Sequence, residues 1–177
     1  MYKILVPVDF SEKFNYAVKM AAKIGKNIEA EIYLLHLVEL PSGIVDMGAG
    51  SNFSIPESMM YLRKVKEKIL ALKATYFQDD QIVRYSIKFQ NPFEGITDYV
   101  KKINANLIVM GSKGVSDFEE MIIGSNTEKV VRTSTIPVIV VKADSKKFKF
   151  KKLVFASNYD DENKGAFVDF LHFAKQF

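Results

Sequence analysis

The sequence contains no cysteine and no tryptophan, and it has two histidines among its 177 residues. Without cysteine the chain can form no disulfide, no thiolate metal site and no cysteine nucleophile, and two histidines cannot build a multi-histidine metal centre alone. No apolar run approaches the roughly 20 residues that span a bilayer, and no charged and then apolar leader precedes the first strand pattern. We therefore expect a cytoplasmic protein with no membrane segment and no metal centre of its own.

A strong charge of one sign is missing as well. The formal net charge is +4, which tolerates anionic ligands but does not indicate the clustered basic face that nucleic acids need. The lysines from Lys146 to Lys152 are interpreted as a solvated linker, so we expect no nucleic-acid partner. What the chain does have is 48 % hydrophobic residues and a length that suits one α/β domain of about 140 to 150 residues plus an extension.

Apolar runs and amphipathic stretches alternate along the first 143 residues. Five runs have the pattern of buried strands: 3–9, 31–39, 82–90, 106–111 and 136–141. Four stretches between them have the apolar spacing or end signals of helices: 10–25, 57–76, 91–104 and 125–134. Because every crossover carries a helix, we expect a parallel sheet covered on both faces, in a Rossmann-like, doubly wound α/β fold. Such folds bind ligands beyond the carboxyl ends of the strands, where the strand order reverses.

Single residues allow sharper expectations about these elements. Gly25 is predicted to close the first helix, and Asn91 to cap the third, with Pro92 in its first turn. The second helix is predicted to place the following residues on one apolar face: Met59, Leu62, Val65, Ile69, Leu72 and Tyr76. His36 lies inside an apolar strand pattern and is interpreted as a core histidine rather than as a ligand or a general base.

The stretch MGSKGVSDFEEMIIGSNTEKVV contains three glycines, Gly111, Gly114 and Gly124. The first two stand where the fourth strand ends, and a residue without Cβ lets the backbone turn there and approach a ligand. Ser125 is predicted to be the N-cap of the next helix, with Glu128 completing a capping box. The free N–H groups and the positive dipole end of that helix can hold phosphate. The spacing matches neither the Walker loop nor the Gly-x-Gly-x-x-Gly pattern.

The spacing Gly-x2-Gly-x9-Gly-Ser after LIVMG, followed by a helix and PVIVVK, resembles the nucleotide-binding motif of the universal stress protein family. The stretches KILVPVDFSE, LLHLVE and STIPVIVVK resemble that family in order and position, so that the resemblance covers about residues 2–142. It implies a five-stranded parallel sheet of order 3-2-1-4-5, the arrangement of the adenine nucleotide α-hydrolases. It also implies ATP, with or without Mg²⁺, at the switch point between strands one and four, and dimers formed largely through the last strand.

The resemblance also implies roles for single residues. It places these residues at the base and ribose: Asp9, with Pro7 and Val8 beside the base, and Val38, Met110 and Gly111. It places these residues at the phosphates: Gly114, Gly124, Ser125, Asn126 and Thr127. Asn126 departs from the family pattern, because an apolar residue is frequent at that position. Asp9 has a second interpretation that the sequence leaves open, which is a cap for the first helix.

The last residues repeat a pattern seen at the start of the chain. After the linker at 144–151, residues 152–177 show an apolar run, a polar turn and an amphipathic helix, as the first residues of the chain do. We interpret 1–143 as the domain and 152–177 as the first β-α unit of an incomplete second repeat; a generic β-α unit is the alternative. One strand and one helix cannot bury their own apolar faces, so the unit is expected to dock on the domain or on another chain.

The fifth strand pattern, from Ile136 to Val141, is long and apolar for a sheet edge, and such an edge invites pairing. We expect a homodimer through this strand, or a pseudo-dimer with a second repeat.

The function that the resemblance implies is that of an ATP-binding, nucleotide-responsive stress-response module. The sequence shows no base, nucleophile, Walker lysine or arginine finger aimed at a γ-phosphate, so we expect no catalytic residue and at most weak ATP hydrolysis. Two alternatives stay open: a dimeric interaction module with a vestigial nucleotide site, and an adenine-nucleotide α-hydrolase enzyme. Those enzymes typically place a phosphate loop directly after strand one, where this chain reads VDFSEK without glycine.

Overall fold

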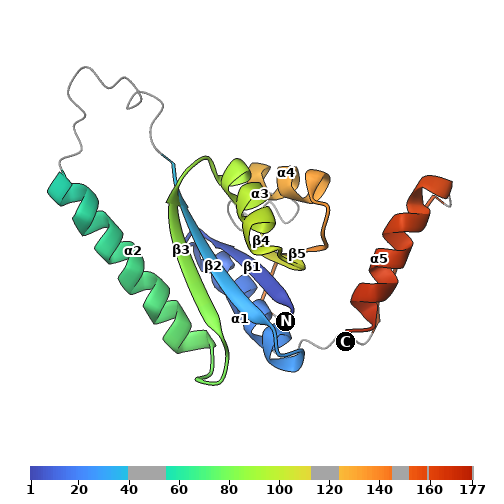
Figure 1. The fold of residues 1–177 in the computed structure, drawn as a ribbon, viewed down its shortest axis with the longest axis horizontal. Coiled ribbons are helices and arrows are strands. Elements are labelled where there is room, and N and C mark those ends of the chain that lie inside the picture. Colours follow the sequence, from blue (N-terminus) through green and yellow to red (C-terminus); the bar gives the residue numbers. More distant parts are fainter. Residues whose placement is uncertain (40–54, 113–123, 145–151, 159, 177) are drawn as a thin grey trace, which may run out of the picture.

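The computed structural model describes residues 1–39, 55–112, 124–144, 152–158 and 160–176. Five strands form one sheet: β1 (Lys3–Val8), β2 (Glu31–Val38), β3 (Val83–Phe89), β4 (Leu107–Gly111) and β5 (Val138–Val141). Neighbouring strands are parallel, and their order is β3-β2-β1-β4-β5 (Figure 1). The predicted doubly wound sheet and its order are therefore confirmed.

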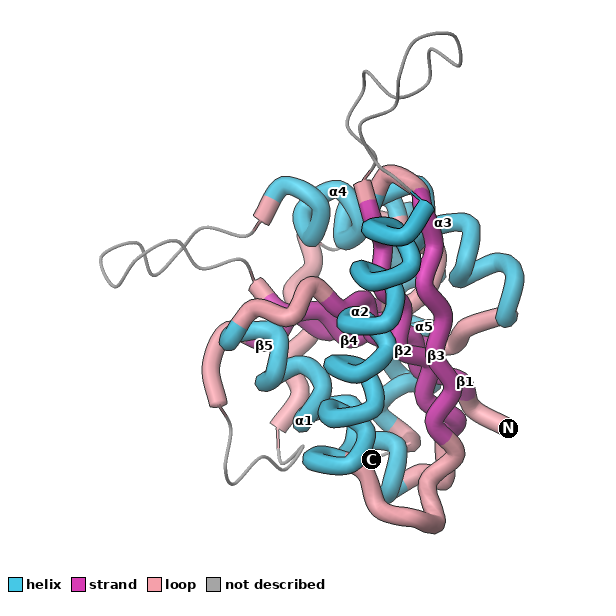
Figure 2. The backbone as a smooth tube through the Cα atoms, turned by 90° about the vertical axis from the view of Figure 1, so that its left-hand side faces the viewer, coloured by secondary structure: helices cyan, strands magenta, loops and turns pink. Residues whose placement is uncertain are grey.

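The helices lie on both faces of this sheet, as crossovers between parallel strands require. Their bounds are α1 (Glu12–Asn27), α2 (Ile55–Tyr76), α3 (Pro92–Ile103), α4 (Ser125–Thr133) and α5 (Lys164–Ala174), the last preceded by a 3₁₀ turn, η1 (Asp161–Asn163). The core against α1 and α2 is separate from the core against α3 and α4. In Figure 2, which views the molecule from the side of α2, that helix lies across the front of the strands.

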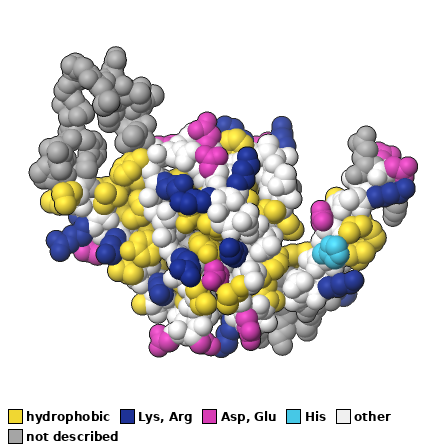
Figure 3. All heavy atoms as spheres, viewed as in Figure 1, with side chains coloured by type: hydrophobic (Ala, Val, Ile, Leu, Met, Phe, Trp, Pro, Cys, Tyr) yellow, Lys and Arg dark blue, Asp and Glu magenta, His cyan; other side chains and the backbone are white. Residues whose placement is uncertain are grey.

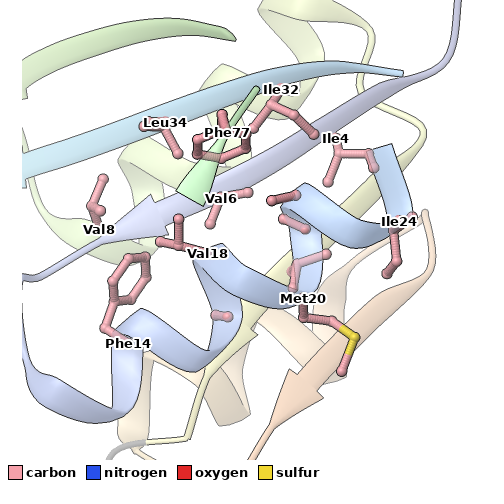
Figure 4. Packing of buried hydrophobic residues seen from close by; sticks show 14 of the residues in the cluster. Ile4, Val6, Val8, Phe14, Val18, Met20, Ile24, Ile32, Leu34 and Phe77 are labelled. Carbon is pink, nitrogen blue, oxygen red and sulfur yellow. The ribbon is translucent and has the colours of Figure 1, made fainter. Parts of the chain in front are cut away.

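Successive residues of β1 alternate between the two cores, because side chains of a strand point to opposite faces in turn. Ile4 and Val6 pack against Val18 and other residues of α1 (Figure 4), whereas Leu5 belongs to the core under α3 and α4. The exposed fraction of Ile4, Leu5 and Val6 is 0 %. Burial on both faces explains why the strand reads as a continuous apolar run rather than an alternating one.

The two predictions about helix ends, one for Asn91 and one for Gly25, had different outcomes. Asn91 caps α3 as predicted: its side-chain Oδ1 accepts hydrogen bonds from the N–H groups of Phe93 (3.0 Å) and Glu94 (3.5 Å). Gly25 does not close α1, which runs on to Asn27. A Cβ on Gly25 would lie 2.7 Å from Cδ1 of Ile32 in β2, so this glycine lets the helix pack closely on the sheet.

Strand β5 is shorter than the predicted run of 136–141. It begins at Val138, directly after Pro137. Proline has no N–H to donate to a ladder, although the carbonyl of Pro137 still accepts a hydrogen bond of 3.0 Å from the N–H of Ile108. The four residues of β5 form one edge of the sheet, beside β4.

The apolar face predicted for α2 is buried over its second half and exposed at its start. Val65 and Ile69 are buried, whereas Met59 is 67 % exposed. The 22 residues of α2 run alongside the seven residues of β3. At its start, however, α2 does not close on β3, because an open pocket lies between them, lined by Met59, Met60 and Leu62 of α2 and by Ile87 and Phe89 of β3. Hydrophobic side chains therefore reach the surface on this side of the molecule (Figure 3).

The C-terminal segment stands beside the sheet rather than in it (Figure 1). Its helix, α5, is present, but residues 152–158 belong to no strand in the described part of the chain. Phe155 packs against Phe167 and Phe170, with ring centroids 5.2 Å apart in each pair, and Phe173 contacts the core under α1. Val154 remains 88 % exposed. None of the described helices combines the length and the hydrophobicity that a membrane span needs.

Candidate functional site

A pocket of about 210 Å³ opens at the carboxyl ends of β1 and β4. These two strands pair at Ile4–Leu107 and at Leu5–Ile108, and the residues that follow them line the two sides of the pocket. The helices that follow the two strands lie on opposite faces of the sheet, α1 on one and α4 on the other. This is the switch point at which the sequence predicted a ligand site.

All but two of the residues predicted to bind the ligand line this pocket. From β1 and β4 come Pro7, Val8, Asp9, Met110 and Gly111, and from the start of α4 come Gly124, Ser125, Asn126 and Thr127. Val38, the last residue of β2, is not in the lining. Gly114 lies outside the residues that the structure describes. The binding roles of these residues stay predictions, but their shared location is a property of the fold.

The lining also contains residues that sequence reasoning missed. Leu35 and Leu37 of β2, and Pro92 and Ile96 of α3, form an apolar wall on the α3 side. The signal for this wall was the strand period, because Leu35 and Leu37 share a face with each other and not with His36. Ser11, Phe14 and Ser112 complete the lining.

Asp9 shapes a turn and faces the pocket at the same time. Its Oδ1 accepts a hydrogen bond of 2.8 Å from the N–H of Ser11, and its side chain lines the pocket. The N-cap of α1 is Ser11, without a side-chain hydrogen bond. Asp9 therefore stabilises the turn before the helix and does not cap the helix, so the cap interpretation is wrong. Contact of Asp9 with a ligand stays a prediction.

The start of α4 differs by one residue from the prediction. Gly124 is the N-cap, its carbonyl accepts a hydrogen bond of 2.9 Å from the N–H of Glu128, and Ser125 is already helical. The predicted capping box is wrong, because Glu128 forms a salt bridge with Arg132 instead, at 2.9 Å. The cap has no side-chain hydrogen bond, so the first N–H groups of α4 keep their capacity to bind an anion.

The electrostatics of the described lining are simple. Asp9 is the one ionisable side chain among the described lining residues. An anion here would be held by backbone N–H groups, by hydroxyl groups and by the helix dipole. Among the described residues no three histidine, aspartate or glutamate side chains come together as a metal site. The described site therefore combines an apolar wall, one carboxylate, hydroxyl groups and the start of a helix.

Comparison with known proteins points to the same part of the chain. The model of the universal stress protein family matches residues 1–142. Universal stress protein MJ0577 of Methanocaldococcus jannaschii is 32 % identical over 160 residues, which cover 80 % of this chain and 96 % of that protein. The solved structure of MJ0577 has a TM-score of 0.63 and 28 % identity, covering 81 % of this chain and 97 % of the other. A universal stress protein of Archaeoglobus fulgidus, solved in complex with dAMP, has a TM-score of 0.56 and 18 % identity, covering 80 % of this chain and 98 % of the other, and shows the fold alone.

Proposed function

This chain belongs to the universal stress protein family, and on that basis we propose that its pocket binds an adenine nucleotide, ATP. The observation that carries the proposal is the pocket at the switch point, where the start of α4 faces the end of β1. A solved structure of the same fold holds dAMP, which supports a nucleotide as the ligand class. The proposed role is that of a nucleotide-responsive stress-response module.

The described residues fit the parts of such a ligand. The apolar wall of Leu35, Leu37 and Ile96 suits the base, and the carboxylate of Asp9 can accept hydrogen bonds from ribose hydroxyls. The N–H groups at the start of α4 suit the phosphates. The described lining contains no lysine or arginine, so Mg²⁺ bound together with the nucleotide would neutralise part of the phosphate charge there.

We propose binding rather than dedicated catalysis. The described lining contains no pair of a nucleophile and a base within hydrogen-bond distance. The chemistry left to the site is to orient a nucleotide, and slow hydrolysis would need only a positioned water molecule.

The proposal is tested by calorimetry of ATP binding to the wild type and to Gly124→Val. The backbone of Gly124 has φ −59° and ψ 145°, which valine adopts without strain, so the substitution adds bulk at the phosphate side and leaves the backbone alone. Gly165→Ala is the matched control, because a Cβ there meets nothing within 4 Å. Micromolar-range binding that Gly124→Val abolishes and Gly165→Ala retains is expected.

Absence of binding to the wild type, or equal binding to Gly124→Val, rejects the proposed site. Mass spectrometry of material released on denaturing the purified protein identifies the nucleotide directly. Recovery of no nucleotide, together with no binding on titration, favours the alternative of a dimeric module with a vestigial site.

We also propose a homodimer through β5 and the residues before it. This edge strand is short, and Val138, Ile139 and Val140 are half-buried rather than buried, so a second copy would cover apolar surface. Light scattering at high micromolar concentration tests the proposal, and a monomer at every concentration contradicts it.

A further inference from the structure

The end of β1, which lines the pocket, pairs with β2 but not with β4. β1 pairs with β2 at six positions, from Lys3–Glu31 to Val8–His36, but with β4 at two, the later being Leu5–Ile108. Beyond Leu5 the chain therefore depends on β2 for its place in the sheet. Pro7, Val8 and Asp9 all belong to this part and all line the pocket.

The side chain of His36 adds a second connection between β2 and this end of β1. His36 is buried, with 7 % of its surface exposed, and its Nδ1 lies 2.7 Å from the carbonyl oxygen of Val8. A carbonyl can only accept a hydrogen bond, so Nδ1 carries the proton and donates it. The Nε2 atom lies 3.5 Å from the hydroxyl of Tyr61 in α2, a long contact that contributes little beside the short one.

The imidazole ring is also held by its neighbours. The ring of Phe10 packs on His36, with centroids 4.7 Å apart, and the Nζ of Lys68 lies 5.3 Å from the centroid of the Phe10 ring. Phe10 has φ 61°, a left-handed conformation that is strained for a bulky side chain. The contact between the two tilted rings offsets this strain and keeps His36 against Val8.

We infer that His36 is a positioning residue of the nucleotide site. Its Nδ1–H group holds the carbonyl of Val8, and through it the stretch from Pro7 to Asp9, at the separation from Gly111 and α4 that a bound nucleotide needs. His36 itself is not in the pocket lining and touches no ligand. The inference rests on the proposed function, since it names what keeps that same site in shape.

Two amide substitutions distinguish the contribution of Nδ1 of His36 from that of Nε2. In His36→Asn the amide nitrogen takes the place of Nδ1, one bond beyond Cγ, and keeps the donor to Val8; in His36→Gln the amide nitrogen lies one bond further out, near Nε2. Loss of one hydrogen bond of about 1.4 kcal/mol corresponds to about tenfold in affinity. Calorimetry is expected to give an ATP affinity within about twofold of wild type for His36→Asn and about tenfold weaker for His36→Gln.

Tyr61→Phe is the matched control, because it removes the hydroxyl at the other nitrogen and leaves the Val8 bond intact. It is expected to bind ATP as the wild type does. Equal affinity of His36→Asn and His36→Gln overturns the inference, as does a loss in Tyr61→Phe as large as the loss in His36→Gln. Both amide variants bury the same kind of group, so a general loss of stability would lower the affinity of both.

Amide hydrogen exchange of the nucleotide-free protein tests the same bond without ATP. His36→Gln is expected to speed exchange from Asp9 to Ser11, where the Ser11 N–H is bound to Asp9, and His36→Asn is expected not to. If the wild type binds no ATP while this exchange pattern is found, the proposed function fails and the hold on Val8 stands. If exchange in His36→Gln equals that of the wild type, the inference about His36 fails whatever the ATP result.

Discussion

The hydroxyl of Thr127 donates a hydrogen bond of 3.2 Å to the carbonyl oxygen of Gly111. The first residue of this pair lies in the first turn of α4 and the second ends β4, so the bond joins the two ends of the glycine-containing stretch. Thr127 is 6 % exposed. Its hydroxyl proton is used in this hydrogen bond, which holds the start of α4 at a fixed distance from the end of β4 on one side of the pocket.

Thr127→Val is therefore expected to weaken ATP binding although valine has nearly the shape of threonine. The change removes the donor and leaves the Gly111 carbonyl without this partner, which lowers the free energy of unfolding by about 1 to 2 kcal/mol. Thr127→Ser keeps the donor and is expected to restore most of the binding. Thr133→Val, on the exposed end of the same helix, is the control. Calorimetry and urea unfolding of the three variants check this, and equal ATP affinity of the valine and serine variants at position 127 contradicts it.

Gly25→Ala is expected to destabilise the domain by about 1 to 3 kcal/mol, the usual range for overpacking a core. The added Cβ would lie 2.7 Å from Cδ1 of Ile32, a fully buried residue, so either this side chain or the helix must shift. Ile32→Val removes that Cδ1 atom. The double variant is expected to lose less free energy of unfolding than the sum of the two single changes. If chemical denaturation gives additive losses of the free energy of unfolding, the contact between the added Cβ and Cδ1 of Ile32 is not the cause of the destabilisation.

The contrast between Gly25 and Asn91 shows what the sequence can predict about this fold. Asn91 caps α3 by accepting hydrogen bonds from N–H groups two and three residues along the chain. Its role can therefore be predicted from the neighbouring sequence. Gly25 has a role that depends on Ile32, which the sheet brings to it, and a local end signal gave the wrong interpretation. The same limit applies to Met59, because its exposure follows from the open pocket between the start of α2 and β3, and the helical period does not contain the spacing between the two elements.

The candidate site shows the same division. The glycine stretch was found in the sequence because turns and helix starts have local signatures, whereas the residues at the end of β1 were predicted from the resemblance to the family. Leu35 and Leu37 were missed because their place in the lining depends on how far β2 extends past β1 and on which helix covers that face. The one-residue shift from Ser125 to Gly124 as the cap lies within the usual uncertainty of helix ends.

A pH-dependent contribution to stability is expected from Glu31 and Tyr33. The Tyr33 hydroxyl donates a hydrogen bond of 2.7 Å to Glu31, and this bond lowers the pKa of Glu31, helped by Arg84 and opposed by burial. A carboxyl whose pKa is lowered by folding stabilises the folded state above its unfolded pKa of about 4.3, and this stabilisation is lost as the pH falls through the folded value. The same bond raises the pKa of Tyr33.

Tyr33→Phe is therefore expected to lower the free energy of unfolding by about 0.5 to 1.5 kcal/mol at pH 7, and by less once the pH falls below the folded pKa of Glu31. Tyr85→Phe, at an exposed tyrosine of β3, is the control and should show no such pH dependence. Urea unfolding from pH 7 down to pH 3 measures both. A difference between Tyr33→Phe and wild type that stays constant over this range contradicts the assignment.

The exposed apolar surface of the C-terminal unit leads to a prediction about association. We propose that residues 152–177 dock on another chain, because Val154 is 88 % and Val168 is 48 % exposed, and one helix with an unpaired segment cannot bury these faces itself. Val168→Asp in α5 is then expected to lower the average mass in light scattering, since a carboxylate in an apolar contact must be desolvated. Val131→Asp in α4 is closely matched, being a valine that is 46 % exposed on a helix of the domain, and is expected to leave the mass unchanged. The comparison separates docking of residues 152–177 from a general effect of added charge. If Val168→Asp, Val131→Asp and the wild type all have the same average mass, residues 152–177 make no contact with a second chain.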